Sequence, residues 1–199
     1  GTLQVNSGDS TTGSATVAVD AVGLTEPVVF ALLNEANDCS QASYTSTLSQ
    51  TLSVANHALV DEDGLRTVRA CLRDAAGQEA VIVDTILLDT TAPTASMTIN
   101  DGAATTTSAS VTLQFDATDA ETVAFGEGIT CAGATYEAYA ASKAYTLQGA
   151  DGTKTVTACL RDVAGNTREL SASIELDTAN PTGTVVVAAG AAYVKTSDV

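Results

Sequence analysis

Apolar and polar residues alternate along much of this chain with a period of two, which is the pattern of half-buried β-strands. Val111, Leu113 and Phe115 share one face of such a segment, and Ile174 and Leu176 share one face of another. No window shows the sustained apolar spacing that predicts a long helix. The pattern therefore predicts an all-β protein.

Turn-forming residues divide the alternating segments into short strands. In the second half of the chain, the segment Asp162-Val-Ala-Gly-Asn166 supplies a side-chain acceptor and a glycine able to adopt positive φ, as a hairpin turn requires. About seven short strands separated by turns are typical of a β-sandwich. The strands predicted there lie near residues 94–100, 109–117, 122–127, 136–140, 144–148, 153–161 and 168–177.

A sequence repeat organises the whole chain. The segment 63–78 returns as 151–166, displaced by 88 residues, with 11 of the 16 positions identical. Shorter matches lie on both sides of this segment, and those upstream have larger displacements, which places the length differences in loops, where insertions are tolerated. These matches are 89–94 with 177–182 at 88, 39–44 with 131–136 at 92, and Val17 and Val19 with Leu113 and Phe115 at 96.

The repeat predicts two complete domains, residues 1–90 and 91–179, followed by the start of a truncated third repeat at 180–199. In the third, Val185-Val-Val187 and Gly190 match Met97-Thr-Ile99 and Gly102. Between the first two, Pro93 removes a backbone donor and fixes φ. We therefore expect a short, semi-rigid linker there.

The composition limits the core and the partners. Hydrophobic residues make up 45% of the 199 residues, but aromatic residues make up only 4% and Trp is missing, so Val, Ile, Leu and Ala must form the core. A net charge of −16 and a pI near 4.1 exclude nucleic acid as an expected partner, because phosphate binding needs the opposite charge. A solvated acidic surface is the simplest explanation of the charge.

Targeting signals are not evident. No apolar run approaches the ~20 residues that cross a bilayer, so we expect no membrane insertion of this segment. No basic start followed by an apolar stretch marks a signal peptide. Since the sequence begins at Gly1 and ends within a repeat, we expect it to be an excerpt of a longer chain.

Four cysteines fall in pairs at equivalent places in the two repeats. Four cysteines allow three pairings, and the equivalence favours bridges within each domain, Cys39–Cys71 and Cys131–Cys159. A zinc site is the alternative, but no Cys has a near Cys or His neighbour. Bridges imply an oxidising compartment, so the sequence predicts an exported, extracellular or cell-surface protein.

Catalysis is not expected. His57 is the only histidine, and with all cysteines bridged no free thiol remains, so nucleophile and base pairs are not available. We interpret His57 as an exposed loop or strand residue. The sequence predicts that this segment is not an enzyme.

Carboxylates are expected to gather where the two repeats meet, because the loops after the second and sixth strands of a sandwich return to its N-terminal end. Ca²⁺ binds such groups through six to eight oxygens. The alternative is that Asp162 caps its turn and the others are solvated, since the sequence has no contiguous Asp-x-Asp-x-Asp-Gly loop. The residues expected at the junction are Asp116, Asp119, Glu121, Asp162 and Asn166 of the second repeat, Asp89 of the linker, and Asp61, Glu62 and Asp63 of the first repeat.

The chain resembles the bacterial immunoglobulin-like tandem repeats of large secreted and surface proteins, including adhesin stalks. The resemblance covers nearly the whole chain and implies immunoglobulin-like β-sandwiches, although a cysteine pair in each repeat departs from the commonest form. The motifs that carry it are Tyr136-Glu-Ala-Tyr139, Asp151-Gly-Thr-Lys-Thr-Val, Arg161-Asp-Val-Ala-Gly-Asn166 and Asp177-Thr-Ala-Asn-Pro181.

The resemblance implies a structural stalk or spacer of a cell-surface or appendage protein, related to adhesion, whose partners are the neighbouring repeats. Some similar repeats are stiffened by Ca²⁺, so we expect a calcium site at Asp89, Asp116, Asp119 and Asp162. Two alternatives stay open: a module that binds glycans or other surface proteins, and an accessory region of a secreted enzyme. The tyrosines available for glycan binding are Tyr44, Tyr136, Tyr139 and Tyr145.

Overall fold

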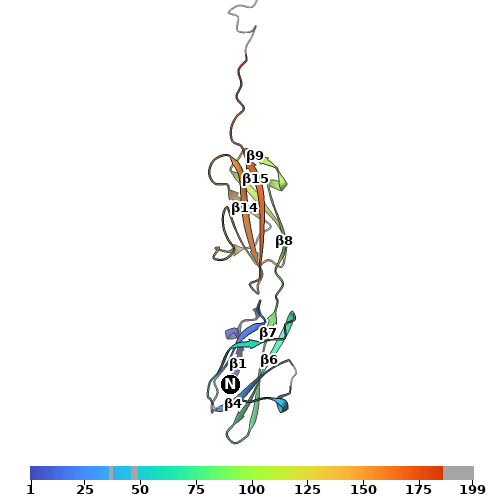
Figure 1. The fold of residues 1–199 in the computed structure, drawn as a ribbon, viewed down its shortest axis with the longest axis vertical. Helices are drawn as coiled ribbons and strands as arrows, with labels where there is room; N and C mark the ends of the chain where they lie inside the picture. Colours follow the sequence, from blue (N-terminus) through green and yellow to red (C-terminus); the bar gives the residue numbers. More distant parts are fainter. Residues whose placement is uncertain (36–37, 46–48, 186–199) are drawn as a thin grey trace, which may run out of the picture.

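The computed structural model describes residues 1–35, 38–45 and 49–185, which form two β-sandwiches placed end to end (Figure 1). Among these residues the helical turns are short 3-10 turns, and no helix is long and apolar enough to span a bilayer. The predicted third repeat, 180–199, lies mostly outside the described residues. Its described part, 180–185, has no regular structure. The 3-10 turns are η1 (Asn6–Gly8), η2 (Cys39–Gln41) and η3 (Asn100–Gly102).

The first sandwich has a sheet of three strands facing a sheet of four. The strand order is β1-β3-β5 in one sheet and β2-β7-β6-β4 in the other. All neighbours are antiparallel except β2 and β7, which are parallel. The bounds are β1 (Thr2–Val5), β2 (Thr11–Thr12), β3 (Thr16–Val22), β4 (Val28–Asn34), β5 (Leu52–Ala58), β6 (Gly64–Asp74) and β7 (Glu79–Leu88).

The second sandwich repeats this arrangement with one additional short strand, β12. Its sheets have the orders β13-β10-β8 and β12-β11-β14-β15-β9, and β9 pairs with β15 in parallel as β2 pairs with β7. The bounds are β8 (Thr94–Ile99), β9 (Thr105–Thr106), β10 (Ser110–Thr118), β11 (Thr122–Gly126), β12 (Glu137–Ala138), β13 (Ser142–Thr146), β14 (Gly152–Arg161) and β15 (Thr167–Leu176). The all-β tandem sandwich predicted from the sequence is confirmed.

The structure corrects one alignment between the repeats. Asn6 accepts a hydrogen bond from the Ala18 N–H, and Asn100 accepts the same bond from the Thr112 N–H. The second long strand of each sandwich is therefore displaced by 94 residues, and the value of 96 was wrong. Strand patterns have a period of two, so a shift of two residues leaves every side chain on its correct face and the sequence pattern cannot detect it.

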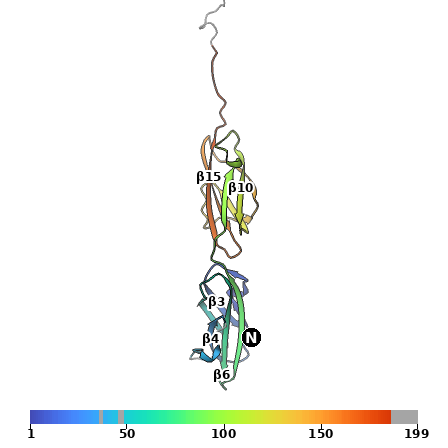
Figure 2. The same cartoon turned by 90° about the vertical axis from the view of Figure 1, so that its right-hand side faces the viewer.

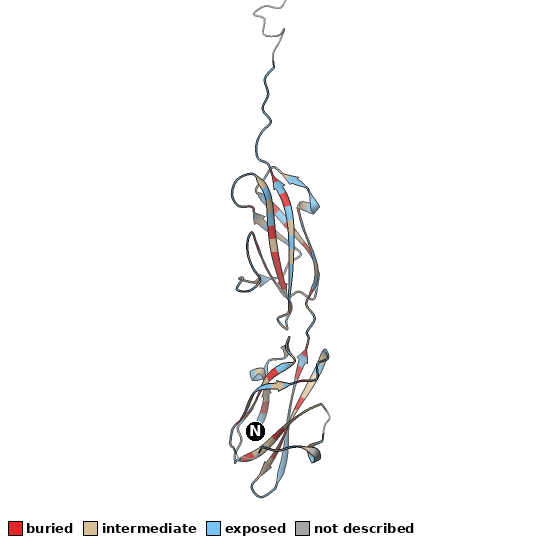
Figure 3. Cartoon of the chain, in the orientation of Figure 1, coloured by how far each residue is buried: buried red, intermediate tan, exposed pale blue. Residues whose placement is uncertain are grey.

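The buried residues of each core come from both sheets of its sandwich (Figure 3). Almost all of them are aliphatic. In the first, Val5 and Val19 of one sheet pack with Val68 and Ile86 of the other, all fully buried. Burying each such side chain contributes about 1.5–3 kcal/mol. Phe115 is the one aromatic residue among the buried core residues of the described chain. The alternation along the strands therefore fixes which face is inside.

A disulfide ties the irregular segment after the fourth strand of each sandwich to the outer face of the adjoining sheet. Cys39 bridges to Cys71 of β6, and Cys131 bridges to Cys159 of β14. Two residues further along each strand, an arginine lies over a tyrosine of the same segment. The guanidinium of Arg73 is 4.0 Å from the Tyr44 ring centroid, and that of Arg161 is 3.9 Å from Tyr136. Each sandwich thus has a bridge and a cation–π pair at equivalent positions.

Removing either bridge is expected to lower the free energy of unfolding of its own sandwich. The bridged residues are 28 and 32 positions apart, and loop closure over such lengths is worth about 3–4 kcal/mol. Urea denaturation of a Cys131→Ala/Cys159→Ala variant, followed in the second sandwich, measures this effect. The Cys39→Ala/Cys71→Ala variant is the matched control, because it leaves the second sandwich intact. Equal stability of the second sandwich in all forms would contradict the expectation.

Candidate functional site at the junction of the two sandwiches

The linker runs from the end of β7 to the start of β8, between the two sandwiches (Figure 2). Residues of three loops lie close to it. The loop between β5 and β6 comes from the first sandwich. The loop between β10 and β11 and the turn between β14 and β15 come from the second. The strand directions inferred from the sequence therefore bring the expected loops together at this junction.

The first sandwich holds the linker through Asp63. One carboxylate oxygen accepts hydrogen bonds from the Thr90 N–H at 2.8 Å and the Thr90 hydroxyl at 2.9 Å. The other oxygen accepts from the Thr91 hydroxyl at 2.8 Å. These bonds, the backbone one first, hold the pKa of Asp63 below its ordinary value, because they favour the charged form. Asp63 was expected at this end as one acid among several, and its binding of the linker was not foreseen.

The second sandwich holds the linker through Asn166. Its side-chain amide donates to the Asp89 carbonyl oxygen at 2.7 Å and lies 3.4 Å from the Thr91 carbonyl oxygen. Asp162, which is 4% exposed, accepts from the same amide at 2.9 Å and from the Asn166 N–H at 2.8 Å. Asp162 therefore does cap its turn, and by doing so it orients the amide toward the linker.

The two sandwiches also touch directly. The Thr11 hydroxyl lies 3.4 Å from the Val163 carbonyl oxygen. At Gly13, an added Cβ would lie 2.7 Å from the Asn166 side-chain oxygen and 3.0 Å from the Ala164 carbonyl oxygen, so a side chain has no room there. Pro93 of the linker is buried. The linker thus contacts both sandwiches, while Thr90 and Thr91 stay exposed.

The same bonding repeats at the far end of the second sandwich. Asp151 accepts from the Thr178 N–H at 2.9 Å and from its hydroxyl at 2.8 Å, as Asp63 does from Thr90. The Ala179 N–H donates to the Asp177 carboxylate at 3.0 Å, as the Thr91 N–H does to Asp89. The segment after each sandwich therefore leaves it in the same way. The sequence contains the signal, because each repeat has an aspartate, Asp63 or Asp151, and a later Asp-Thr pair, 89–90 or 177–178, at the same displacement of 88.

Three of the four predicted calcium ligands lie together. One carboxylate oxygen from each of Asp89, Asp119 and Asp162 lies within 4.8 Å of the others. Asp116 is outside this group, on β10 in register with Ser96 of β8. Since three carboxylates offer fewer than the six to eight oxygens that Ca²⁺ takes, backbone carbonyls or water would have to complete the shell. The calcium site remains a prediction.

The groups most often used in catalysis have structural partners here. His57 lies on β5, half-buried rather than exposed as expected, with Nε2 2.7 Å from the Asn34 side-chain oxygen. Burial lowers its pKa, because the charged form is less well solvated. All four cysteines are bridged.

A hollow of about 210 Å³ lies at the N-terminal end of the first sandwich. Its lining contains no histidine or cysteine and includes Leu24, Leu72, Asp74, Gln78 and Ile82.

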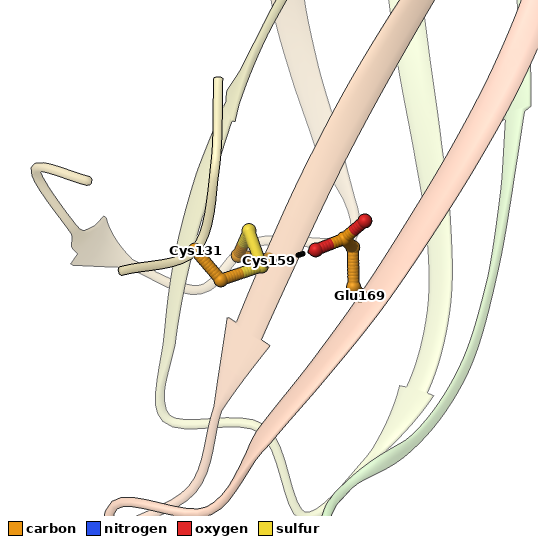
Figure 4. A group of neighbouring side chains, drawn as sticks. All are labelled: Cys131, Cys159 and Glu169. Atoms are coloured by element: carbon orange, nitrogen blue, oxygen red, sulfur yellow. Dashed lines mark hydrogen bonds between the residues drawn. A yellow bond between two sulfur atoms is a disulfide. The ribbon is translucent and has the colours of Figure 1, made fainter. Parts of the chain in front are cut away.

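A carboxylate lies beside the bridge of the second sandwich (Figure 4). The Glu169 side-chain oxygen is 3.3 Å from the Cys131 sulfur. The sulfurs of Cys131 and Cys159 are bonded to each other, so they do not offer thiolates to a metal. This group is therefore a structural bridge with an acidic neighbour.

The tyrosines considered for glycan binding are engaged within the fold. Tyr44 and Tyr136 lie under arginine guanidinium groups. Tyr139 packs against the second core with its hydroxyl 3.4 Å from the Phe115 carbonyl oxygen, and the Tyr145 hydroxyl accepts from the Glu127 N–H at 3.0 Å. These rings serve packing first.

Comparisons with known proteins support the fold. No known protein family and no curated protein matches the chain. Among solved structures, it is similar to the fibronectin(III)-like modules of Clostridium thermocellum CbhA, with a TM-score of 0.51 and 14% identity over 87% of this chain and 93% of that one. It also matches a tetra-tandem repeat in the extending region of a large adhesion protein, with a TM-score of 0.30 and 18% identity over 89% of this chain and 49% of that one. The first likeness shows the fold, which is that of immunoglobulin-like and fibronectin(III)-like sandwiches.

Calcium is expected to raise the melting temperature of the wild-type chain relative to chelator, since a ligand at about 20 times its dissociation constant stabilises a protein by about 2 kcal/mol. Asp119→Asn should remove the difference, because Asp119 belongs to the group of three carboxylates. The change suits its backbone φ of 67°, which asparagine also adopts. Asp116→Asn is the matched control. Identical melting curves with and without calcium would show that no calcium binds here, so that Asp162 only caps its turn and the other acids are solvated.

Proposed function

We propose that this pair of sandwiches is a rigid, non-catalytic spacer in an extracellular or cell-surface protein of the adhesin type. Its partners are neighbouring repeats of the same chain. A spacer needs a fixed geometry between successive domains. The proposal therefore rests on the contacts at the junction between the two sandwiches.

The observation behind the proposal is that the linker is held from both sides. Asp63 of the first sandwich binds Thr90 and Thr91, while Asn166 of the second binds the Asp89 carbonyl group. Each neutral hydrogen bond contributes about 0.5–1.5 kcal/mol, and bonds to a carboxylate contribute more. A free hinge would leave these linker groups to water. Here the linker is instead hydrogen-bonded to both sandwiches.

The disulfides support export to an oxidising compartment, where such bonds form and persist. They also favour a structural role in small domains. Sandwiches of this size with few aromatic residues have little apolar area to bury, and cross-links reduce the entropy of their unfolded chains.

Glycan binding is a weaker candidate, because the four candidate tyrosines already pack or hydrogen-bond within the second sandwich or lie beneath arginines. Carbohydrate binding through these rings would require that they leave these contacts. The accessory region of a secreted enzyme would use the same rigid geometry, so the spacer function is common to both settings.

Asn166→Ala and Asp63→Ala are each expected to widen the distribution of angles between the sandwiches, because each removes one side of the hold on the linker. Distances between spin labels on the two sandwiches, measured by pulsed electron paramagnetic resonance, report that width. The double variant should show the broadest distribution.

Asp151→Ala is the matched control for Asp63→Ala. Asp151 makes the same bonds at the far end of the second sandwich, so its loss should leave the angle between the two sandwiches unchanged. If the wild-type distribution is already as broad as that of the double variant, the chain is a flexible tether and the proposal fails.

A further inference from the structure

The two disulfides lie at equivalent places in the fold. Each joins a partly exposed cysteine of the irregular segment, Cys39 or Cys131, to a fully buried cysteine of a strand, Cys71 or Cys159. A dissolved reagent therefore reaches both bridges from the side of the irregular segment. The side chains beside the sulfurs then decide how the two bridges differ in reactivity.

A carboxylate contacts the bridge of the second sandwich (Figure 4). Glu169 lies opposite Cys159 in the pairing of β14 with β15, and one of its oxygens is 3.3 Å from the Cys131 sulfur. This carboxylate and the two sulfurs all lie within 4.8 Å of one another. Glu169 is exposed, so it places a negative charge where a reagent must approach the sulfurs.

The bridge of the first sandwich has an uncharged residue at the equivalent position. Val81 lies opposite Cys71 in the pairing of β6 with β7. Within the described part of the chain, no carboxylate lies within 4.8 Å of both sulfurs of this bridge. Asp38 precedes Cys39, but its carboxylate accepts from the Ser40 N–H at 3.1 Å and the Ser40 hydroxyl at 2.8 Å. The two repeats therefore differ in the charge that touches the bridge.

The other charged groups near the bridges have partners of their own. On the first sandwich, Arg73 pairs with Glu79 at 2.7 Å, and Arg69 lies close enough to Asp38 to interact with its charge. On the second, Arg161 lies 3.9 Å from the centre of a tyrosine ring, as its equivalent Arg73 does at 4.0 Å. Among the described residues, the carboxylate opposite the second bridge is thus the one charged group found in contact with a bridge sulfur.

A carboxylate in this position opposes the reaction that opens a disulfide. The reagent is a thiolate, which attacks one sulfur while the bond to the other sulfur breaks, so negative charge approaches the bridge. Attack on the more accessible Cys131 brings that charge beside Glu169, whereas attack on Cys39 does not meet a carboxylate in contact with the sulfur. Two like unit charges about 4 Å apart in water slow such a step about fivefold.

We propose that the Cys39–Cys71 bridge is a thiol-exchange site for small anionic thiols, and that Glu169 protects the Cys131–Cys159 bridge from them. The thiolate bonds to the Cys39 sulfur, and the electron pair of the broken bond leaves on the Cys71 sulfur, which takes a proton from water. A second thiolate then attacks the small thiol's sulfur in this mixed disulfide. The small thiol is thereby oxidised to its own disulfide, and both cysteines are reduced.

Opening the first bridge alone leaves the junction in place. It removes one of the two contacts that hold the segment 38–45 on β6, the other being the cation–π pair of Arg73 and Tyr44. The protected bridge holds β14, and the turn after β14 contains Asn166, which donates to the linker. Small thiols therefore loosen the first sandwich before they affect the geometry between the two sandwiches.

Reduction of the full chain by glutathione at about pH 8, where part of a thiol is ionised, tests the proposal. Samples are alkylated at intervals, and mass spectrometry of their peptides measures the reduced fraction of each bridge. In the wild type the first bridge should open faster than the second. Glu169→Gln should speed the opening of the second bridge about fivefold and leave the first unchanged. Val81→Glu, which places a carboxylate at the equivalent position of the first sandwich, should slow the first bridge by a similar factor.

An uncharged reductant separates the effect of charge from effects of access and stability. Tris(hydroxypropyl)phosphine is neutral, so Glu169→Gln should not change the rate at which it opens the second bridge, whereas a variant with a loosened fold would open faster with both reagents. The proposal is overturned if the second bridge of the wild type opens with glutathione as fast as the first. It is also overturned if Glu169→Gln has no effect with glutathione, or the same effect with the phosphine. Each of these results leaves the spacer function, which depends on the junction, unaffected.

Discussion

The structure depends on fastening a long, irregular segment to the outside of a thin aliphatic core. In its described residues, the segment after the fourth strand of each sandwich has only the turn η2 or the two-residue strand β12 as regular structure. It is held by a disulfide and, two residues along the same strand, by an arginine lying on a tyrosine. The chain has no tryptophan, so these two contacts hold the segment without the buried indole that antibody domains contain.

The same strands that carry these contacts also build the junction. β14 holds Cys159 and Arg161, and the turn that follows it contains Asp162 and Asn166, of which Asn166 donates to the linker and Asp162 orients it. The bridge thus stabilises the strand from which the turn projects. In the second repeat, fold stability and the geometry between the two sandwiches therefore have a common structural support.

Much of this was visible in the sequence, for definite physical reasons. The strands could be located because apolar and polar residues alternate along them and because the same segments recur 88 residues later, and both patterns can be read directly from the sequence. They also favoured the bridges within repeats that the structure contains. The displacement of β3 and β10 was wrong by two residues because a period of two is blind to that shift. The short strands β2 and β9 were missed, since two residues make no pattern.

The junction was only partly predictable. Loop directions brought Asp89, Asp119 and Asp162 together as expected, whereas Asp116 lies elsewhere because β10 continues two residues past it before the chain turns. The roles of Asp63 and Asn166 depend on side-chain hydrogen bonds across 27 and 77 residues, which neither alternation nor composition reports. The signal available in the sequence for the role of Asp63 was that Asp63 and Asp89-Thr90 both recur in the second repeat, as Asp151 and Asp177-Thr178.

The parallel pairing of β2 with β7, and of β9 with β15, has a mechanical consequence. Each pair joins a strand near the start of its sandwich to the strand at the end. A pulling force along the long axis therefore loads these hydrogen bonds in shear, so that they must break together rather than one after another. If these hydrogen bonds break, the disulfide between Cys131 and Cys159 still prevents the 28-residue span between these two positions from extending. A chain built this way transmits tension with little lengthening.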